Sequence, residues 1–428
     1  MRRQVLAAGV FVVSCLAHPM AEGSDPVLKP YTGPSEEGVD TATLTGKIMC
    51  GYQGWFNCEG DGAGLQWVHW SKNRRQAPGP GNVSVDLWPD LSEYGPEERF
   101  ATSFKHSDGR VAEVFSSYNK ATVRRHFQWM REYGIDGAFV QRFANGLGNS
   151  KIVHHKNVVL SHARESANRN GRAYALMYDL SGLGSGKVES VRNDWVNLRT
   201  KMQITRDPAY LKHEGRPVIA VWGIGFSDDR AYSLSECREL VEFLKSDGCT
   251  VMLGVPTWWR EGRRDAVSDP ELREIINLAD IVSPWTVGRY RNPKEAQRHA
   301  EKVWTPDLAW CSERHLDFLP VVFPGFSWHN LKGEGLGAIP RMKGQFLWSQ
   351  LLAAKRSGIE MIYVAMFDEV DEGTAIFKCT NDPPADKGVS FLNYEGLSSD
   401  YYLRLTGLGG KLLREEIPQS EKIPKKSL

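Results

Sequence analysis

Eight short apolar segments of strand type recur along the chain, with amphipathic helical stretches between them. The segments are 47–52, 137–142, 173–179, 217–222, 249–254, 280–284, 319–323 and 359–367. The clearest helices are predicted at 121–133, 233–245, 293–303 and 341–357. In the first helix, Val123, Phe127 and Met130 recur at helical spacing, and Gly134 ends it before the next strand. This alternation predicts parallel strands joined by right-handed crossovers.

The predicted fold class is α/β, and the predicted architecture is a single (β/α)8 TIM barrel with a long loop after the first strand. We place this barrel domain at 47–415. An open doubly wound sheet is the alternative, and it would need a phosphate loop or a switch-point motif. No G-x-G-x-x-G follows a strand, and the Gly-rich run 182–186 lacks a matching helix start. The barrel is therefore the preferred interpretation.

The first 21 residues have the pattern of a secretory signal peptide. Arg2 and Arg3 precede an apolar stretch that is too short to span a bilayer, and small residues follow at 19–21. We therefore expect a secreted or periplasmic protein, with a linker at 22–46 and a polar tail at 416–428. The stretch ending in Cys15 also resembles a lipobox, so a lipoprotein anchored at Cys15 is the alternative. Only that anchor would make a membrane a partner.

Charge and cysteine content narrow the function classes. The 53 basic and 52 acidic residues give a formal net charge of +1, which argues against a nucleic-acid partner. Beyond Cys15, six cysteines have irregular spacing and form no C-x-x-C metal pattern. Disulfides are compatible with export, with Cys50–Cys58 and Cys237–Cys249 the pairs nearest in sequence, and buried free thiols are the alternative.

The last strand is followed by four carboxylates within five residues: Asp368, Glu369, Asp371 and Glu372. Like charges this close repel, so at least one carboxyl is expected to keep its proton near neutral pH, as general acid/base chemistry requires. A solvated acidic turn and a calcium loop are the alternatives. The spacing lacks the regular alternation of a calcium loop, and we expect no metal ligands here.

Polar and aromatic residues stand at the ends of the other predicted strands. In barrels of this type the chemistry lies at the carboxyl ends of the strands, so these residues are expected to meet at one mouth. Aromatic platforms, amides, arginines and carboxylates together favour a polyhydroxylated ligand. The candidate binding residues are Tyr52, Gln53, Trp55, Gln141, Arg142, Tyr178, Trp222, Trp258, Trp285, Arg289, Trp328 and His329, with Asp368 and Asp371 as neighbours that tune charge.

A long loop is predicted between the first strand and the first clear helix, at about 57–119. It carries Trp67, His69, Trp70 and Trp88 together with Pro and Gly residues. Loops of this length are usually functional walls or lids, and decoration of the fold is the alternative. We expect this loop to contribute to the binding mouth.

Glycoside cleavage fits these residues. It needs a proton donor for the leaving oxygen and a carboxylate that activates the attacking group. Glu369 and Glu372, three residues apart after a strand, are candidates for both roles. Asp179, at the end of the third predicted strand, is expected to face them and to bind a hydroxyl beside the reacting carbon.

The segment 359–377 resembles the last-strand motif of glycoside hydrolase family 99, which reads approximately S-F-N-E-W-H-E-G-T-Q-I-E. It also resembles the W-N-D-x-G-E-S motif of glycoside hydrolase family 71. Family 99 contains endo-α-mannosidases and mannanases, and family 71 contains α-1,3-glucanases. The stretch 178–182 is similar to the F-D-M-S-G of family 71, and 133–137 and 51–56 fit the barrel starts of this group. The resemblance spans most of 47–380.

The resemblance implies that Glu369 is the base and Glu372 the acid. Family 99 retains the anomeric configuration through an epoxide-like intermediate, whereas family 71 inverts it with water, and both outcomes stay open here. Three positions depart from the motif. Asp368 replaces Asn, Val370 replaces an aromatic residue, and Asp371 replaces His or Gly, so a subsite wall and a hydrogen-bond donor differ.

The sequence thus predicts a secreted glycoside hydrolase of family 71/99 type that acts on a polysaccharide or glycan without a cofactor. A barrel that binds carbohydrate without cleaving it and a metal-dependent hydrolase on the same fold are the alternatives. The sugar, the linkage and the oligomeric state are not predicted.

Overall fold

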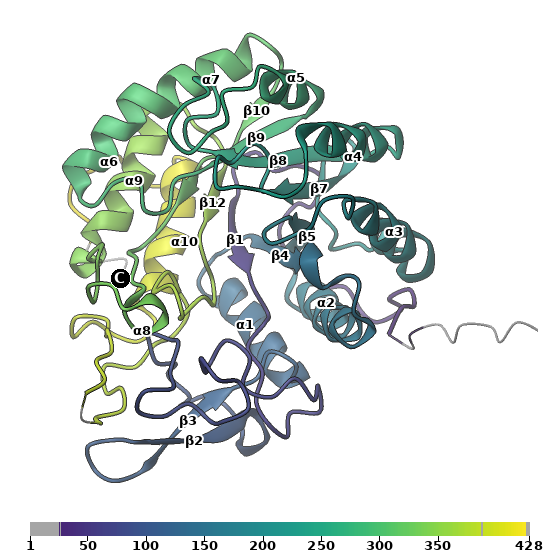
Figure 1. Ribbon diagram of the computed structural model, residues 1–428. Coiled ribbons are helices and arrows are strands. Elements are labelled where there is room, and N and C mark those ends of the chain that lie inside the picture. The colour runs from purple at the N-terminus through teal and green to yellow at the C-terminus, as the bar shows by residue number, and fades with distance from the viewer. Residues whose placement is uncertain (1–24, 26, 387, 425–428) are drawn as a thin grey trace, which may run out of the picture.

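The computed structural model describes residues 25, 27–386 and 388–424, and its core is a ring of parallel strands surrounded by helices (Figure 1). All strands of the ring pair in parallel, in the order β10-β9-β8-β7-β5-β4-β1-β12-β11. They are β1 (Ile48–Tyr52), β4 (Gly137–Phe143), β5 (Ala173–Asp179), β7 (Arg216–Trp222), β8 (Thr250–Pro256), β9 (Ile281–Trp285), β10 (Asp317–Phe318), β11 (Val321–Val322) and β12 (Ile362–Val364). The short β6 (Lys212–His213) pairs antiparallel with β7 outside the ring.

The ring closes through the segment that contains β10 and β11. The N–H of Leu319 donates to Val282 of β9, and on the other side the N–H of Tyr363 in β12 donates to Pro320. Because proline has no N–H, the segment pairs as two short pieces and not as one long strand. Counted as one strand, they complete eight. The predicted (β/α)8 barrel is confirmed, with each predicted strand at or near its expected place.

Helices lie outside the ring and cover it (Figure 1). They are α1 (Lys120–Glu132), α2 (Ser150–Asn170), α3 (Glu189–Asn197), α4 (Leu234–Ser246), α5 (Glu271–Leu278), α6 (Pro293–His299), α7 (Thr305–Ser312), α8 (His329–Lys332), α9 (Gln345–Arg356) and α10 (Tyr401–Leu413). Local signals explain their starts. Asn119 caps α1, and Ser233 and Glu236 form a capping box at α4. The predicted helices correspond to α1, α4, α6 with the turn after it, and α9.

The strands are buried on both faces, as parallel strands under helices must be. Every residue of β1, β5 and β8 is buried. The inward side chains fill the barrel, and the outward ones pack against the helices. A strand-end residue therefore reaches either the mouth of the barrel or the layer between strands and helices.

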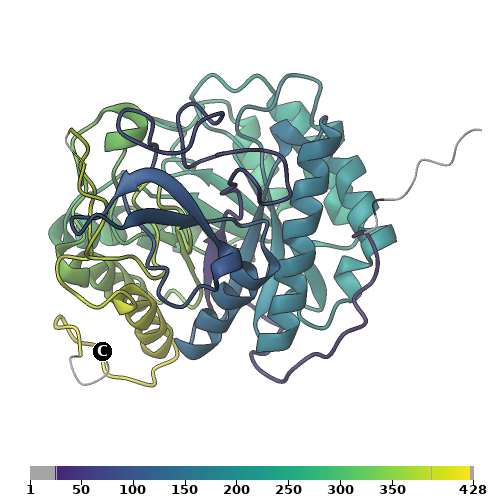
Figure 2. The same ribbon diagram turned by 90° about the horizontal axis from the view of Figure 1, so that it is seen from below.

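The long region predicted after β1 is present, and part of it forms regular structure. It contains the antiparallel hairpin of β2 (Arg99–Lys105) and β3 (Val111–Phe115), which lies beside α1 (Figures 1 and 2). Aromatic rings pack beneath it, including Trp70 against Trp88 at 6.5 Å and against Phe115 at 5.3 Å between ring centroids. This small apolar core gives the region a fixed shape.

The segments predicted as linker and tail pack on the barrel where the structure describes them. The N–H of Glu36 donates to Asn168 at the end of α2, and the N–H of Lys212 donates to Thr41. The indole of Trp348 on α9 donates to the carbonyl of Ser420 at 2.8 Å. The predicted signal peptide and Cys15 lie outside the described residues, so both remain predictions.

The six described cysteines are buried free thiols, so neither of the two nearby pairs forms a disulfide. Cys50 lies in β1 and is fully buried. In the described part of the chain, none of the helices has the length and apolarity that crossing a membrane requires.

We expect Gly407→Ala to destabilise the barrel although alanine favours helices. A Cβ on Gly407 of α10 would lie 1.7 Å from the carbonyl oxygen of Tyr133, in the turn after α1. Backbone cannot yield as a side chain can, so we expect a loss of about 1–3 kcal/mol in the free energy of unfolding. Chemical denaturation measures this, with the exposed Lys411→Ala on the same helix as control. Equal midpoints for the two variants would contradict the packing.

Candidate active site

The acidic stretch after β12 is a buried turn and not a solvated one. Asp368, Glu369 and Asp371 are only 0%, 3% and 3% exposed, and Glu372 is half-buried at the surface of a cleft. Burial of four neighbouring carboxylates requires compensating contacts, since each charged group loses its hydration. The partners of each carboxylate therefore indicate what each one does.

The Arg341 side chain binds the backbone of the acidic turn. Its Nη2 donates to the carbonyl oxygens of Gly373 at 2.8 Å and Ala375 at 2.7 Å. The N–H groups of Thr374 and Ala375 donate to the carbonyl oxygen of Glu369. These bonds close the turn on itself and leave the Glu369 and Glu372 side chains directed at the cleft.

Glu369 receives two side-chain hydrogen bonds. Gln53 Nε2 donates at 2.6 Å, and Thr374 Oγ1 donates at 2.8 Å. Donors directed at a carboxylate stabilise its charged form. Burial and the nearby Glu372 raise the pKa of Glu369 well above its ordinary value, and the two donors oppose that rise only in part. Of the two glutamates, Glu369 is the one that two side-chain donors hold in a fixed orientation.

Glu372 has the surroundings of a proton donor. Burial and the charge of Asp371 raise the pKa of Glu372 to about 8, and Trp328 opposes this rise only in part. Two carboxyls this close share a proton, because both cannot ionise without strong repulsion. With two donors bound to Glu369, we place that proton on Glu372 at neutral pH.

Asp179 enters the same cleft from the end of β5. The N–H of Ser181 donates to its Oδ1 at 2.7 Å. Burial raises the pKa of Asp179 to about 6, while this hydrogen bond lowers it. The charge of Asp179 contributes to the raised pKa of Glu372, so the two interact electrostatically across the cleft.

The cleft has a volume of about 560 Å³ and lies at the carboxyl end of the barrel. It brings together many of the residues predicted from strand ends. The predicted residues that line it are Gln53, Trp55, Gln141, Asp179, Trp222, Trp285, Arg289, Trp328, Glu369 and Glu372. The indoles of Trp222 and Trp285 meet edge to face at 5.4 Å between ring centroids, which gives the cleft a flat aromatic side.

The loop after β7 adds residues that the sequence did not indicate. Phe226, Asp228 and Arg230 line the cleft, and the Arg230 guanidinium lies over the Trp222 ring at 5.3 Å. Arg230 also forms an ion pair with Asp228 at 2.6 Å. These residues lie beyond the end of a predicted strand, where only the folded loop brings them back to the cleft.

Tyr52, Arg142 and Tyr178 do not line the cleft, which corrects their predicted place at the mouth of the barrel. Tyr52 bonds to His126 of α1 at 3.0 Å between Oη and Nδ1. Arg142 forms a bidentate pair with Asp194 of α3 at 2.6 and 2.5 Å, and the Tyr178 hydroxyl donates to the same carboxylate at 2.6 Å. All three point outward from the ring, into the layer between strands and helices.

Trp258 and His329 also lie outside the cleft lining. The Trp258 ring lies beneath the guanidinium groups of Arg263 at 4.1 Å and Arg264 at 4.3 Å. His329 begins the short α8, and its Nδ1 lies 2.7 Å from the carbonyl oxygen of Glu334. Both residues lie beyond the end of a strand, where strand geometry does not determine the direction of a side chain.

Asp368 and Asp371 support the site from behind. Asp368 accepts the backbone N–H groups of Gln53 at 2.8 Å and Gly54 at 2.9 Å, and burial raises its pKa to about 7. Asp371 lies 2.9 Å from Nδ1 of His69, which stacks on Trp55 at 3.7 Å between ring centroids. The long region after β1 thus contacts the acidic turn directly.

Among the described residues, no three His, Cys, Asp or Glu side chains are grouped so that they could hold a metal ion. The chemistry that the arrangement itself supports is proton transfer. It places the carboxyl groups of Glu369, Glu372 and Asp179 around one cleft with aromatic sides.

We expect Asp194→Ala to destabilise the protein strongly, because it leaves the Arg142 guanidinium buried without its carboxylate. The loss should be about 3–5 kcal/mol in the free energy of unfolding. The control is Glu189→Gln on the same helix, which breaks only an exposed pair with Arg192 and should cost less than about 1 kcal/mol. Denaturant unfolding measures both, and a small effect of Asp194→Ala would contradict the network.

The chain has the fold of known glycoside hydrolases. It superposes on the glycoside hydrolase family 99 endo-α-mannosidase of Bacteroides thetaiotaomicron with a TM-score of 0.64 at 16% identity, covering 87% of this chain and 99% of that one. A second structure of that enzyme, in complex with bis-tris propane, gives 0.60 at 16% identity, with 87% and 98% covered. A glycoside hydrolase-like protein gives 0.52 at 12% identity, with 90% and 98% covered.

No family model matches the chain, and no curated protein matches it in sequence. At these identities the likeness to solved structures concerns the fold. The barrel that the family 99 resemblance implied is therefore confirmed: the chain shares its architecture with a family 99 enzyme over most of both lengths.

Proposed function

We propose that the protein is a glycosidase that hydrolyses glycosidic bonds in a polysaccharide or glycan outside the cytoplasm. The observation that carries the proposal is the Glu369–Glu372 pair, three residues apart in a buried turn that opens on an aromatic cleft. The two carboxyls have unlike surroundings, and an acid and a base with separated roles need that difference. The shared fold with a family 99 endo-α-mannosidase supports the same reaction class.

In this mechanism Glu372 protonates the leaving glycosidic oxygen. Its raised pKa keeps the proton available at neutral pH. Loss of the leaving group develops positive charge at the anomeric carbon, and the nearby carboxylates stabilise that charge. The role requires the partial exposure that Glu372 has, since the oxygen it protonates enters from the cleft.

Glu369 is the base. Its Gln53 and Thr374 donors hold the carboxyl in one orientation and favour its charged form. It removes a proton either from a sugar hydroxyl, with retention, or from water, with inversion. Asp179 accepts a hydrogen bond from a hydroxyl next to the reacting carbon. The anomer of the first product distinguishes the two routes.

Sugar rings bind against the aromatic side chains of the cleft. Trp55, Trp222, Trp285 and Trp328 line it, and indole faces suit the apolar faces of pyranoses. At the position of the aromatic residue in the resembling motifs, this chain has Val370, which is fully buried. The cleft therefore lacks one aromatic wall, so we propose a different substrate from that of the endo-α-mannosidase.

We expect Glu372→Gln to lower turnover by about 10²–10⁴-fold, because an amide cannot donate the proton that the leaving oxygen needs. Binding of oligosaccharide should persist, since the amide keeps the shape of the side chain. Hydrolysis of a panel of α- and β-linked glycans, followed by NMR of the product anomer, measures the loss. The control is Glu334→Gln, an exposed carboxyl that does not line the cleft.

Unchanged turnover in Glu372→Gln would overturn the acid assignment. Tight oligosaccharide binding by the wild type without any turnover would favour the carbohydrate-binding barrel. Activity lost with a chelator and restored by a metal would favour the metal-dependent hydrolase.

We also expect kcat/KM to follow a bell-shaped pH profile with a basic limb near 8. The working form of Glu372 is protonated, so activity is present below its pKa of about 8 and falls as pH rises through it. Glu369 works ionised, so activity falls on the acid side as it gains a proton. Steady-state rates across the pH range test this. A profile that stays flat through pH 8 would contradict the assignment.

A further inference from the structure

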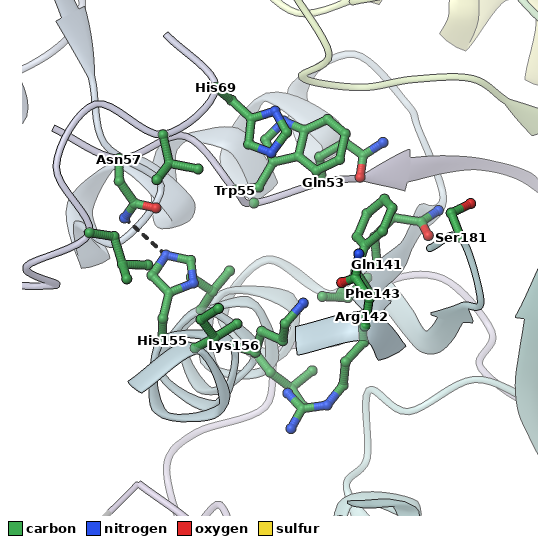
Figure 3. Close-up of a pocket in the computed structure, with 18 of the residues that line it drawn as sticks. Gln53, Trp55, Asn57, His69, Gln141, Arg142, Phe143, His155, Lys156 and Ser181 are labelled. Carbon is green, nitrogen blue, oxygen red and sulfur yellow. Dashed lines mark hydrogen bonds between the residues drawn. The ribbon is translucent and has the colours of Figure 1, made fainter. Parts of the chain in front are cut away.

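A second cavity of about 420 Å³ adjoins the cleft, between the end of β1, β4 and α2 (Figure 3). The rings of Trp55 and Phe143 lie 5.1 Å apart between centroids and line both spaces. Gln53, Gln141 and Ser181 also line both. A sugar bound in the cleft therefore lies next to this cavity, within reach of a substituent on its ring.

The two spaces have opposite charge. The cleft is lined by the acids Asp179, Asp228, Glu369 and Glu372, and its two arginines are each paired with an acid, Arg230 with Asp228 and Arg289 with Asp265. None of the described residues that line the cavity is acidic, whereas Arg74, Arg142 and Lys156 line it. The proposed reaction does not use these cations.

Lys156 is the cation most free to bind a ligand. Figure 3 shows its ammonium directed from α2 into the cavity. It has no hydrogen-bond or ion-pair partner among the residues that the structure describes, and the Phe143 ring centroid lies 5.6 Å from its Nζ. Val140, Leu160 and Leu176 line the same space, and apolar surroundings screen a charge less than water does.

Arg142 contributes less charge to the cavity than Lys156 does, but it has one N–H donor group without a partner. Asp194 neutralises its guanidinium through two hydrogen bonds. The residue is only 1% exposed, and its Nη1 has no partner in the described part of the chain. A buried nitrogen without a partner is unusual in proteins. It is a second unused donor in the lining of the cavity that Lys156 enters.

We propose that this cavity binds an anionic substituent of the substrate, a carboxylate or a sulfate ester, with Lys156 as its main contact. The inference rests on the proposed glycosidase function and narrows its substrate to charged glycans. The acids of the cleft repel an anion, and the cavity attracts it. This difference selects one orientation of the sugar, in which the charged group lies behind the Trp55 and Phe143 rings.

The lowered pKa of Lys156 also fits a site for an anion. Burial and the nearby Arg142 lower the pKa of Lys156 to about 7, so its charge is poorly compensated in the free protein. A bound carboxylate or sulfate would stabilise the charged form.

The first test changes the substrate and leaves the protein intact. A panel of sulfated and uronate-containing polysaccharides is digested beside the desulfated or carboxyl-reduced form of each. We expect kcat/KM to favour the anionic form by about 10- to 100-fold, the range for a charge-assisted hydrogen bond. The two halves of the panel show whether sulfate or carboxylate is preferred. Equal or faster cleavage of the neutral forms would overturn the proposal.

The second test changes the lysine. Lys156→Met should reduce the preference for the anionic form by about the same factor, chiefly through KM, and Lys156→Arg should restore part of it. The exposed Lys302→Met, between α6 and α7, is the matched control and should keep the wild-type preference. A Lys156→Met variant with an unaltered preference would refute the role of this residue.

The third test does not depend on hydrolysis. Thermal unfolding is measured in sodium sulfate and sodium acetate against sodium chloride of equal ionic strength. Because sulfate stabilises most proteins, the informative quantity is the difference between variants. Extra stabilisation of the wild type and Lys302→Met over Lys156→Met supports the anion site even if no glycan in the panel is cleaved. Equal stabilisation of all three, together with no charge preference, rejects the site while leaving the glycosidase proposal standing.

Discussion

The two oxygens of the Asp368 carboxylate accept the backbone N–H groups of Gln53 and Gly54, and so connect the loops after the last and first strands of the barrel. Gln53 then donates its side-chain amide to Glu369. Gly54 has a φ of 59°, a left-handed conformation that directs the chain toward Trp55. One buried carboxylate thus positions the donor for Glu369 and the approach to the aromatic wall. An asparagine, with a single acceptor oxygen, could not accept both N–H groups in the same way.

Burial has a second consequence, which is the unequal protonation of the acids. Four carboxylates in one turn would be destabilising if all were charged. Asp368 is compensated by backbone donors, Asp371 by His69 and Glu369 by Gln53 and Thr374. In the described part of the chain Glu372 has no comparable pair of donors, and burial raises its pKa to about 8, so we assign it the role of the acid. The acid in the proposed reaction follows from where the donors are placed.

The sequence predicted the strands well because each is a short apolar run, and it predicted the acidic turn because charges rarely cluster after a strand. It could not predict which strand-end residues face the cleft. Neighbouring residues on a strand point to opposite sides. Asp179 and Gln141 face inward, whereas Tyr178 and Arg142 face outward. In a ring buried on both faces, apolar patterning does not separate these two sets.

Tertiary partners explain the other differences. The outward-facing Arg142 and Tyr178 both donate hydrogen bonds to Asp194. Asp194 lies 52 residues from Arg142, so no local sequence pattern indicates this pairing.

Helix α2 was not among the clear predictions, because its buried face carries Asn157, Arg164 and Asn168 and so lacks a strong apolar period. Lys156 lies on this helix beside Asn157, and its chemistry is visible only when the cavity is formed. The positions of polar residues buried between strands and helices are thus the hardest part of this fold to predict from apolar periodicity.

The pairing of Asp371 with His69 connects the departures from the resembling motif to the long region after β1. Where the family 99 motif has a histidine in the acidic turn, this chain has Asp371, and an imidazole arrives instead from His69. The same ring stacks on Trp55, which lies between the acidic cleft and the cationic cavity. The aromatic core under the β2–β3 hairpin gives the region that carries His69 a fixed shape. The inserted region therefore supplies part of the wall that the cleft and the cavity share, and the contact of His69 with Asp371 connects that wall to the acidic turn.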